Sequence, residues 1–285
     1  IEPWFLNRRL SLGVDLFRRD ARYYSDEYDQ LTTGAALTLG KPLRSFNRIN
    51  WIYGLENIDI NNVSTNASDL ILAEEGGRLK SYGTVELIRD TRDSTFVATR
   101  GFRGSAAATV AGGPFGGDTD TYQFQLRAAQ YFPLWFDHVL CLRGWGSLIE
   151  EYGDSDRVPI FDRLFMGGPR TVRAFKYRKV GPKDEDREAI GGRSAATLTA
   201  EYTIPVFEKI RLAFFYDGGI VWQDLFDEDL ENPATGDGEY CDGYGLGVRF
   251  DFPGFPIQLD YAWPINTDDM LGDSGRFSFT IGYTY

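Results

Sequence analysis

Apolar and polar residues alternate with a period of two along almost the whole chain. Between residues 122 and 131, one face carries Tyr, Phe, Leu and Ala, and the opposite face carries Gln, Gln, Arg and Ala. The same alternation recurs in 196–204, 244–252 and 277–285. Successive side chains of a β-strand point to opposite faces, whereas a helix repeats every ~3.6 residues. The pattern therefore predicts an all-β chain.

Twelve segments with this period can be delimited. They lie near residues 8–19, 30–40, 46–58, 79–90, 103–111, 121–132, 138–149, 194–204, 210–222, 242–252, 256–263 and 276–285. Their connections alternate between short and long. Tight turns are expected at 40–45, 132–137, 205–209 and 253–255, and long loops at 59–78, 150–193 and 223–241. Only the link at 90–102 is longer than the others on its side.

This asymmetry separates a membrane barrel from a soluble sandwich. Outer-membrane barrels have tight periplasmic turns, long outer loops and aromatic girdles. Several of the short turns carry aromatic residues: Phe132, Trp135, Phe136, Phe207 and Phe255. The polar face is rich in Gly, Thr, Ser and Gln, which suits a wet lumen better than the charged outer face of a sandwich. We expect one transmembrane antiparallel β-barrel domain over residues 1–285.

Other function classes lack their usual residues. The net charge of −12, from 30 basic and 42 acidic side chains, argues against nucleic acid as a partner. Cys141 and Cys241 lie far apart and form no zinc or disulfide pattern, and His138 is the sole histidine. The acid pairs at 74–75 and 150–151 are interpreted as solvated loop residues. We therefore expect no catalytic residue, metal or cofactor, and no enzyme.

The segment 166–175 (MGGPRTVRAF) is a basic, Gly/Pro-rich part of the longest loop. Two strands that follow it each place one acid, Glu201 and Asp217, on the polar face. A guanidinium carried into the lumen needs carboxylates that it can contact in a bidentate manner. The sequence thus predicts that the loop at about 150–193 folds into the lumen and that Arg173 contacts both acids. In the alternative interpretation, Arg173 is solvated and the acids merely line a wet lumen.

These residues also carry a family resemblance. Residues 172–175 (VRAF) are similar to a Val-Arg-Gly-Phe/Tyr signature, and further matches are 199–202 (TAEY), 214–222 (FFYDGGIVW), 90–93 (DTRD) with 99–101 (TRG), and the last strand ending in Tyr285. Together they resemble the C-terminal barrel of the BamA-like outer-membrane protein assembly factors, in the surface-antigen superfamily.

The resemblance implies a lumen latch formed by Val172, Arg173, Ala174, Phe175, Glu201 and Asp217. Ala174 departs from the Gly of the signature, and it would be strained if that position required a positive φ. The resemblance also implies an assembly signal or seam at Phe277, Phe279, Ile281, Gly282, Tyr283 and Tyr285. That strand is either a weakly paired seam that templates incoming strands or an ordinary girdle strand.

The resemblance begins at the fifth strand of the family, so the periplasmic repeats and the first four strands are absent from this sequence. An isolated barrel would then close the strand at 8–19 onto the strand at 276–285, because unpaired edges in lipid are costly.

The implied function is folding and insertion of β-barrel proteins in the outer membrane of a Gram-negative-type envelope. The implied partners are outer-membrane lipid, unfolded outer-membrane proteins, and assembly-complex lipoproteins that bind through the absent repeats. The alternative is a passive pore, or an engineered, re-closed smaller barrel without insertase activity.

Overall fold

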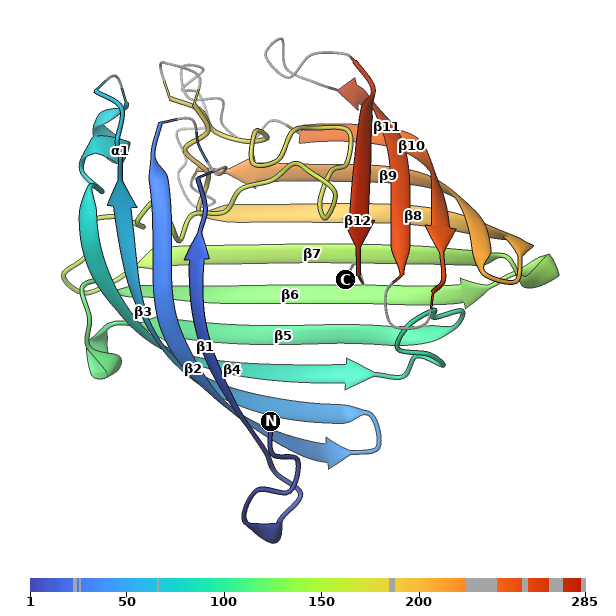
Figure 1. Ribbon diagram of the computed structural model, residues 1–285, viewed down its shortest axis with the longest axis horizontal. Helices are drawn as coiled ribbons and strands as arrows, with labels where there is room; N and C mark the ends of the chain where they lie inside the picture. Colours follow the sequence, from blue (N-terminus) through green and yellow to red (C-terminus); the bar gives the residue numbers. More distant parts are fainter. Residues whose placement is uncertain are drawn as a thin grey trace.

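The computed structural model describes residues 1–22, 25, 27–65, 67–184, 188–223, 240–252, 256–266 and 274–282. In this part of the chain, twelve strands form one antiparallel sheet whose spatial order follows the sequence (Figure 1). The strands are β1 (Ser11–Asp20), β2 (Asp29–Arg44), β3 (Asn47–Asn61), β4 (Gly76–Asp90), β5 (Gly101–Ala111), β6 (Thr121–Pro133), β7 (Val139–Glu151), β8 (Ser194–Phe207), β9 (Ile210–Trp222), β10 (Tyr240–Phe250), β11 (Ile257–Asn266) and β12 (Arg276–Ile281). The predicted all-β antiparallel architecture is confirmed.

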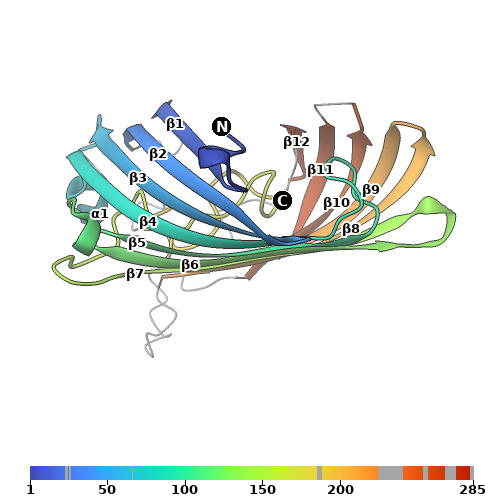
Figure 2. The same cartoon turned by 90° about the horizontal axis from the view of Figure 1, so that it is seen from below.

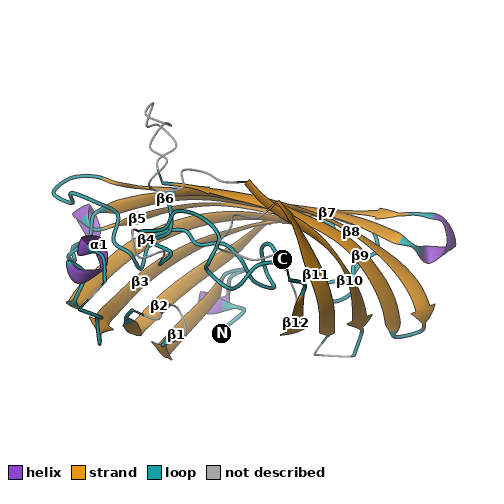
Figure 3. Ribbon diagram, turned by 90° about the horizontal axis from the view of Figure 1, so that it is seen from above, coloured by secondary structure: helices purple, strands orange, loops and turns teal. Residues whose placement is uncertain are grey.

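The sheet curves into a trough that is open along one side (Figures 2 and 3). Strands β1 and β12 form its two edges, and no pairing joins them within the described residues. The expected closure of the first strand onto the last is therefore wrong for this structure. The twelve strands curve too gently to meet, so they form only part of a cylindrical wall. The concave face of this wall is called the lumen below.

The two faces of the sheet differ as the alternation predicts. Leu126, Leu198 and Phe214 lie on the convex face and are exposed, as are most of the large apolar side chains on the strands. Positions of the opposite parity on β8 and β9, such as Thr199 and Asp217, are buried on the luminal face. Exposed apolar residues at alternate positions require lipid as their surroundings.

Two strands continue past the prolines at which their short turns were expected. β2 continues through Pro42 to Arg44, and β8 continues through Pro205 to Phe207. The pairing register shifts next to both prolines. Bulges tolerate the missing N–H of proline, which explains why these strands do not end there. The expected turn at 253–255 lies outside the described residues.

Among the described residues, short helical turns occur only outside the strands. They are η1 (Phe5–Asn7), α1 (Asp69–Leu72), η2 (Gly113–Phe115) and η3 (Trp135–Asp137). None of them is long and apolar enough to cross a bilayer. In η3, Trp135 and Phe136 are exposed at the short-turn end of the sheet, as a girdle requires.

The loop between β7 and β8, residues 152–193 apart from 185–187, lies across the lumen (Figure 3). Its outer part packs on the connections near α1, where Ile160 and Ile190 meet Tyr28, Ile60 and Ile71 in one hydrophobic cluster. The inner part packs on the luminal wall in a second cluster. The predicted loop inside the lumen is thus confirmed.

This packing corrects the interpretation of the two acid pairs as solvated for Glu74 and Glu150, whereas Glu75 is exposed as expected and Glu151 is half-buried. Glu74 is only 1% exposed: Arg157 of the long loop lies 3.6 Å from one oxygen of its carboxylate, and Arg78 lies 3.3 Å from the other. Burial raises the pKa of Glu74, although both arginines act in the opposite direction. Glu150 is also buried, at the end of β7, and its carboxylate lies 2.8 Å from Arg193.

A charge on the convex face tests the membrane orientation of the sheet. We expect Leu126→Arg to lower the free energy of unfolding by about 2–4 kcal/mol, the cost of an arginine near the bilayer midplane. Leu126 is 64% exposed in the middle of β6. The matched control is Gln125→Arg, which points to the lumen from the same strand and should change little. Urea unfolding in lipid vesicles measures both, and equal losses would contradict the orientation.

Candidate functional site

The segment 166–175 forms a compact turn within the long loop. Gly167 and Gly168 adopt φ of +103° and +95°, a region that L side chains avoid. The N–H of Gly167 donates to Thr171 Oγ1 at 3.0 Å, and that of Gly168 donates to the carbonyl of Phe175 at 3.0 Å. These bonds close the turn, so its tip projects Arg173 toward the wall.

Apolar residues of this turn occupy gaps on the wall that glycines leave open. Val172 and Phe175 are fully buried in the inner hydrophobic cluster. A Cβ added to Gly219 of β9 would overlap the sulfur of Met166 and lie 2.9 Å from Val172 Cγ2. A Cβ added to Gly243 of β10 would lie 2.5 Å from the Cβ of Ala174. The wall therefore accepts the loop only because these two positions lack side chains.

Ala174 is not strained by its departure from the glycine of the signature. It is absent from the described residues with positive φ, which do include Arg178 of the same loop. Its methyl group is buried and faces Gly243. The condition under which alanine would be unfavourable at this position is thus not met.

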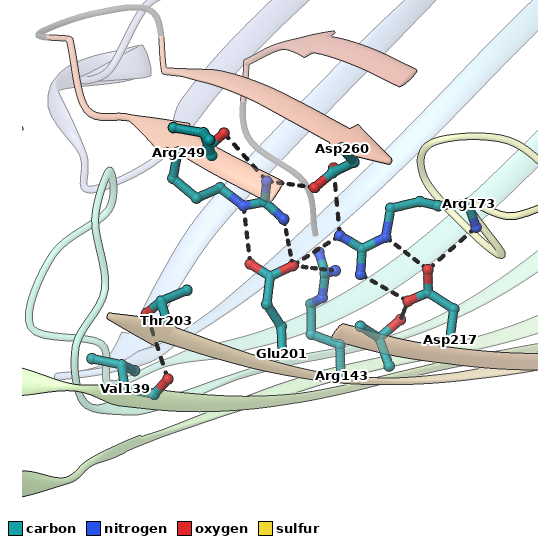
Figure 4. Close-up of polar contacts among 10 residues, drawn as sticks. Val139, Arg143, Arg173, Glu201, Thr203, Asp217, Arg249 and Asp260 are labelled. Carbon is teal, nitrogen blue, oxygen red and sulfur yellow. Dashed lines mark hydrogen bonds and ion pairs between the residues drawn. The ribbon is translucent and has the colours of Figure 1, made fainter. Parts of the chain in front are cut away.

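Arg173 lies against Asp217 of β9 in a bidentate arrangement (Figure 4). Its Nε donates to Asp217 Oδ2 at 2.7 Å and its Nη2 to Oδ1 at 2.9 Å. The backbone N–H of Arg173 donates to the same carboxylate at 3.2 Å, and Thr199 Oγ1 donates to it at 2.8 Å. The guanidinium also stacks on Phe215, with 3.3 Å between Cζ and the ring centroid. Two hydrogen bonds to Asp217 and the contact with Phe215 thus hold the side chain of Arg173, which is 2% exposed.

A second carboxylate, Glu201 of β8, accepts from Arg173 Nη1 at 2.9 Å. The structure therefore brings Arg173 of the loop together with Glu201 and Asp217, the two acids that the period-two alternation places on the luminal face. Glu201 also accepts two bonds from Arg249 of β10, from Nε at 3.1 Å and from Nη2 at 2.8 Å. Asp260 of β11 accepts from Arg249 Nη1 at 2.6 Å and lies 3.5 Å from Arg173 Nη1. Arg143 Nη2 of β7 lies 3.9 Å from Glu201.

Arg249, Asp260 and Arg143 are functional candidates that the sequence reasoning did not identify. Each lies on the polar face of its strand, which is the signal that could have revealed them. With Arg173, Glu201 and Asp217 they form the luminal ion-pair cluster, three arginines and three acids. It joins the loop to four consecutive wall strands, β8 to β11, and reaches β7 through Arg143.

The proposed C-terminal seam is only partly described. Phe277, Phe279 and Ile281 of β12 are exposed on the convex face. The strand ends at Ile281, and Gly282 follows it with φ of +103°, earlier than the predicted end at 285. Tyr283 and Tyr285 lie outside the described residues. Among the residues that the structure describes, β12 pairs with β11 over six residues.

The remaining candidates have structural surroundings. His138 shares a hydrogen bond with the hydroxyl of Tyr202, at 2.5 Å from Nδ1. Cys141 and Cys241 are buried thiols. In the described part of the chain, no three His, Cys, Asp or Glu side chains gather where they could hold a metal ion.

Comparison with known proteins identifies relatives over the whole chain. The profile of the Omp85 superfamily domain matches residues 1–285. The outer membrane protein assembly factor BamA of Nitratidesulfovibrio vulgaris is 30% identical over 286 residues, covering 98% of this chain and 35% of the relative. BamA of Neisseria meningitidis serogroup B is 27% identical and covers 100% of this chain and 40% of its own length. The human sorting and assembly machinery component 50 homolog is 29% identical over 78% of this chain and 49% of its own length.

The fold also has a solved counterpart. The crystal structure of BamA from Haemophilus ducreyi lacking POTRA domains 1–3 superposes with a TM-score of 0.82 at 21% identity. The match covers 98% of this chain and 59% of that chain. The chain thus spans less than half the length of these curated relatives and a larger share of the solved barrel.

Loss of Arg173 should release the loop from the wall. Arg173→Ala leaves Asp217 buried without its main partner, and breaking a buried pair in this way costs about 3–5 kcal/mol. We expect earlier unfolding on a heat-modifiability gel and new protease cleavage within 152–193. Arg170→Ala is the matched control, because Arg170 is exposed three residues away in the same loop. Unchanged cleavage and gel behaviour in Arg173→Ala would contradict a latch.

The close approach of loop and wall can be tested without changing a charge. Gly219→Ala should cost about 1–3 kcal/mol through overpacking and shift the loop away from β9. Gly13→Ala is the control, since a Cβ there would meet nothing closer than 3.7 Å. Protease accessibility of the loop and the urea midpoint report both changes. Equal behaviour of the two variants would show that the loop does not depend on this contact.

Proposed function

The chain belongs to the Omp85 superfamily, whose domain profile spans residues 1–285, and we propose that it is the membrane-embedded part of a factor that folds and inserts outer-membrane β-barrel proteins. It is an outer-membrane β-barrel of the BamA type. Two relatives are named outer membrane protein assembly factors, and a third is named for a sorting and assembly machinery. These names support the proposal, while the chain covers less than half of each relative.

One observation carries the proposal in this chain: the luminal ion-pair cluster holds the long loop against β8 to β11, next to the strand that ends the sheet. A factor that presents a strand edge to a client needs a rigid wall beside a weakly paired strand. β12 fits the weakly paired element, because within the described residues it pairs with β11 over six residues and lies at the edge of the sheet.

The proposed partners follow from this role. Unfolded outer-membrane proteins would be the clients, because their strands can add to an exposed edge through backbone hydrogen bonds. Lipid surrounds the convex face, where apolar side chains are exposed. Lipoproteins of an assembly complex would bind parts of the protein outside this chain. We propose that the role involves no chemical catalysis.

Folding of a second barrel protein in liposomes tests the proposal. We expect liposomes that contain the whole protein to accelerate folding of an added, urea-unfolded outer-membrane protein. Arg173→Ala should reduce this acceleration, because the wall beside the client edge loses its brace. The Arg170→Ala variant should match the unmodified protein. Ion conductance without any acceleration would contradict the proposal and favour a passive pore.

A further inference from the structure

A cavity of about 110 Å³ lies in the lumen between the luminal ion-pair cluster and the short-turn end of the sheet. By the same measure one water needs roughly 10–15 Å³, so the space exceeds that of a single water several times. Glu201, Arg143 and Arg249 of the cluster, which are labelled in Figure 4, line it. Arg211 of β9 and Arg92, which follows β4, also line it.

The turn after β4, residues 91–100, forms one wall of this cavity. It curls back from the end of β4 toward the lower ends of β10 and β11 (Figures 1 and 2). Asp93 fixes its shape by accepting from the N–H groups of Thr99 at 2.9 Å and Arg100 at 3.3 Å. Ser94 accepts from the N–H groups of Phe96 and Val97. The longest link on the short-turn side is thus an ordered wall that brings apolar atoms of Phe96 and Val97 to the cavity.

The guanidinium of Arg211 has more N–H donors than its ion pair with Asp251 uses. Its side chain is 19% exposed, and its Nε lies 3.3 Å from Asp251 Oδ2. Within the described residues this is its one ion pair, whereas a guanidinium offers five N–H donors. Arg249, by contrast, uses Nε and both terminal nitrogens on Glu201 and Asp260. A partly buried guanidinium with unused donors at a cavity wall suits an incoming anion.

We propose that this cavity binds a carboxylate joined to an apolar group, as found in an extended peptide. Arg211 would hold the carboxylate, and the attached carbon group would pack on Phe96, Val97 and Ile257, which line the same space. An inorganic anion such as phosphate has no apolar group that could pack against that wall. The carboxylate comes from a peptide C-terminus or from an Asp or Glu side chain.

The inference rests on the proposed function only for the origin of the peptide, a client chain that passes the short-turn end of the lumen. Binding is measured without any insertion step. A protein that binds the peptide but inserts no client would therefore refute the proposed function and leave this site intact. A protein that inserts clients but does not bind the peptide would refute this site and leave the proposed function intact.

The test uses the folded protein in detergent and a fluorescent pentapeptide that ends in phenylalanine, followed by anisotropy. Three probes are compared: the peptide with a free C-terminal carboxylate, its C-terminal amide, and an amidated peptide with one internal glutamate. We expect the free-carboxylate peptide to bind roughly tenfold more tightly than its amide, the value of one charge-assisted hydrogen bond. Equal binding of the internal-glutamate peptide would identify a side-chain carboxylate as the source.

Arg211→Gln should weaken binding of the free-carboxylate peptide roughly tenfold. Arg127→Gln is the control, because Arg127 lies on the luminal face of β6 and does not line the cavity. Arg211→Lys keeps the charge without the planar fork and should give several-fold weaker binding, even if Arg211→Gln fails to fold. The proposal is overturned if amide and carboxylate bind alike, if acetate binds but the peptides do not, or if the Arg211 variants equal the control.

Discussion

A guanidinium buried in the lumen needs compensating carboxylates, and the arrangement of this protein's loop and wall depends on that need. Arg173 comes from the loop, while Asp217, Glu201 and Asp260 come from three different strands. A buried ion pair often adds little net stability, since desolvation offsets the attraction. Its effect here is on geometry: one position of the loop satisfies every charge, and shifted positions leave a carboxylate unpaired. We infer that the cluster sets the loop's register more than it raises the barrel's stability.

The loop also replaces part of the core that the wall lacks. β9 and β10 carry glycines at luminal positions, where most strands carry side chains, and Met166, Val172 and Ala174 fill the gaps. The outer end of the same loop packs near α1 in a separate cluster. Because one segment contributes to both clusters, moving its inner part strains the contacts of its outer part. The loop thus contributes to both hydrophobic clusters inside the sheet, at its inner and at its outer end.

Much of the fold and of the site could be predicted from side-chain parity, that is, from whether a residue falls on the apolar or the polar face of its strand. Period-two alternation gave twelve strands, and it placed Glu201 and Asp217 on the face to which a folded-in loop would bring Arg173. Parity alone gives no distances between strands, so Arg249 and Asp260 were missed although both lie on the polar face. Local rules failed where tertiary context dominates: bulges carry β2 and β8 past Pro42 and Pro205, and the long loop buries Glu74. The curvature of the sheet could not be predicted from the sequence either, because the number of strands does not determine how strongly a sheet bends.

The balance of charge in the luminal ion-pair cluster has a consequence for permeation. With the loop in place, three arginines face three carboxylates, so the cluster itself carries no net charge. If Arg173 leaves with the loop, the wall retains two arginines and three carboxylates, a net charge of −1. A narrow passage lined in this way attracts cations and repels anions. The side chain that fastens the loop thereby also determines whether this part of the wall is neutral or negatively charged.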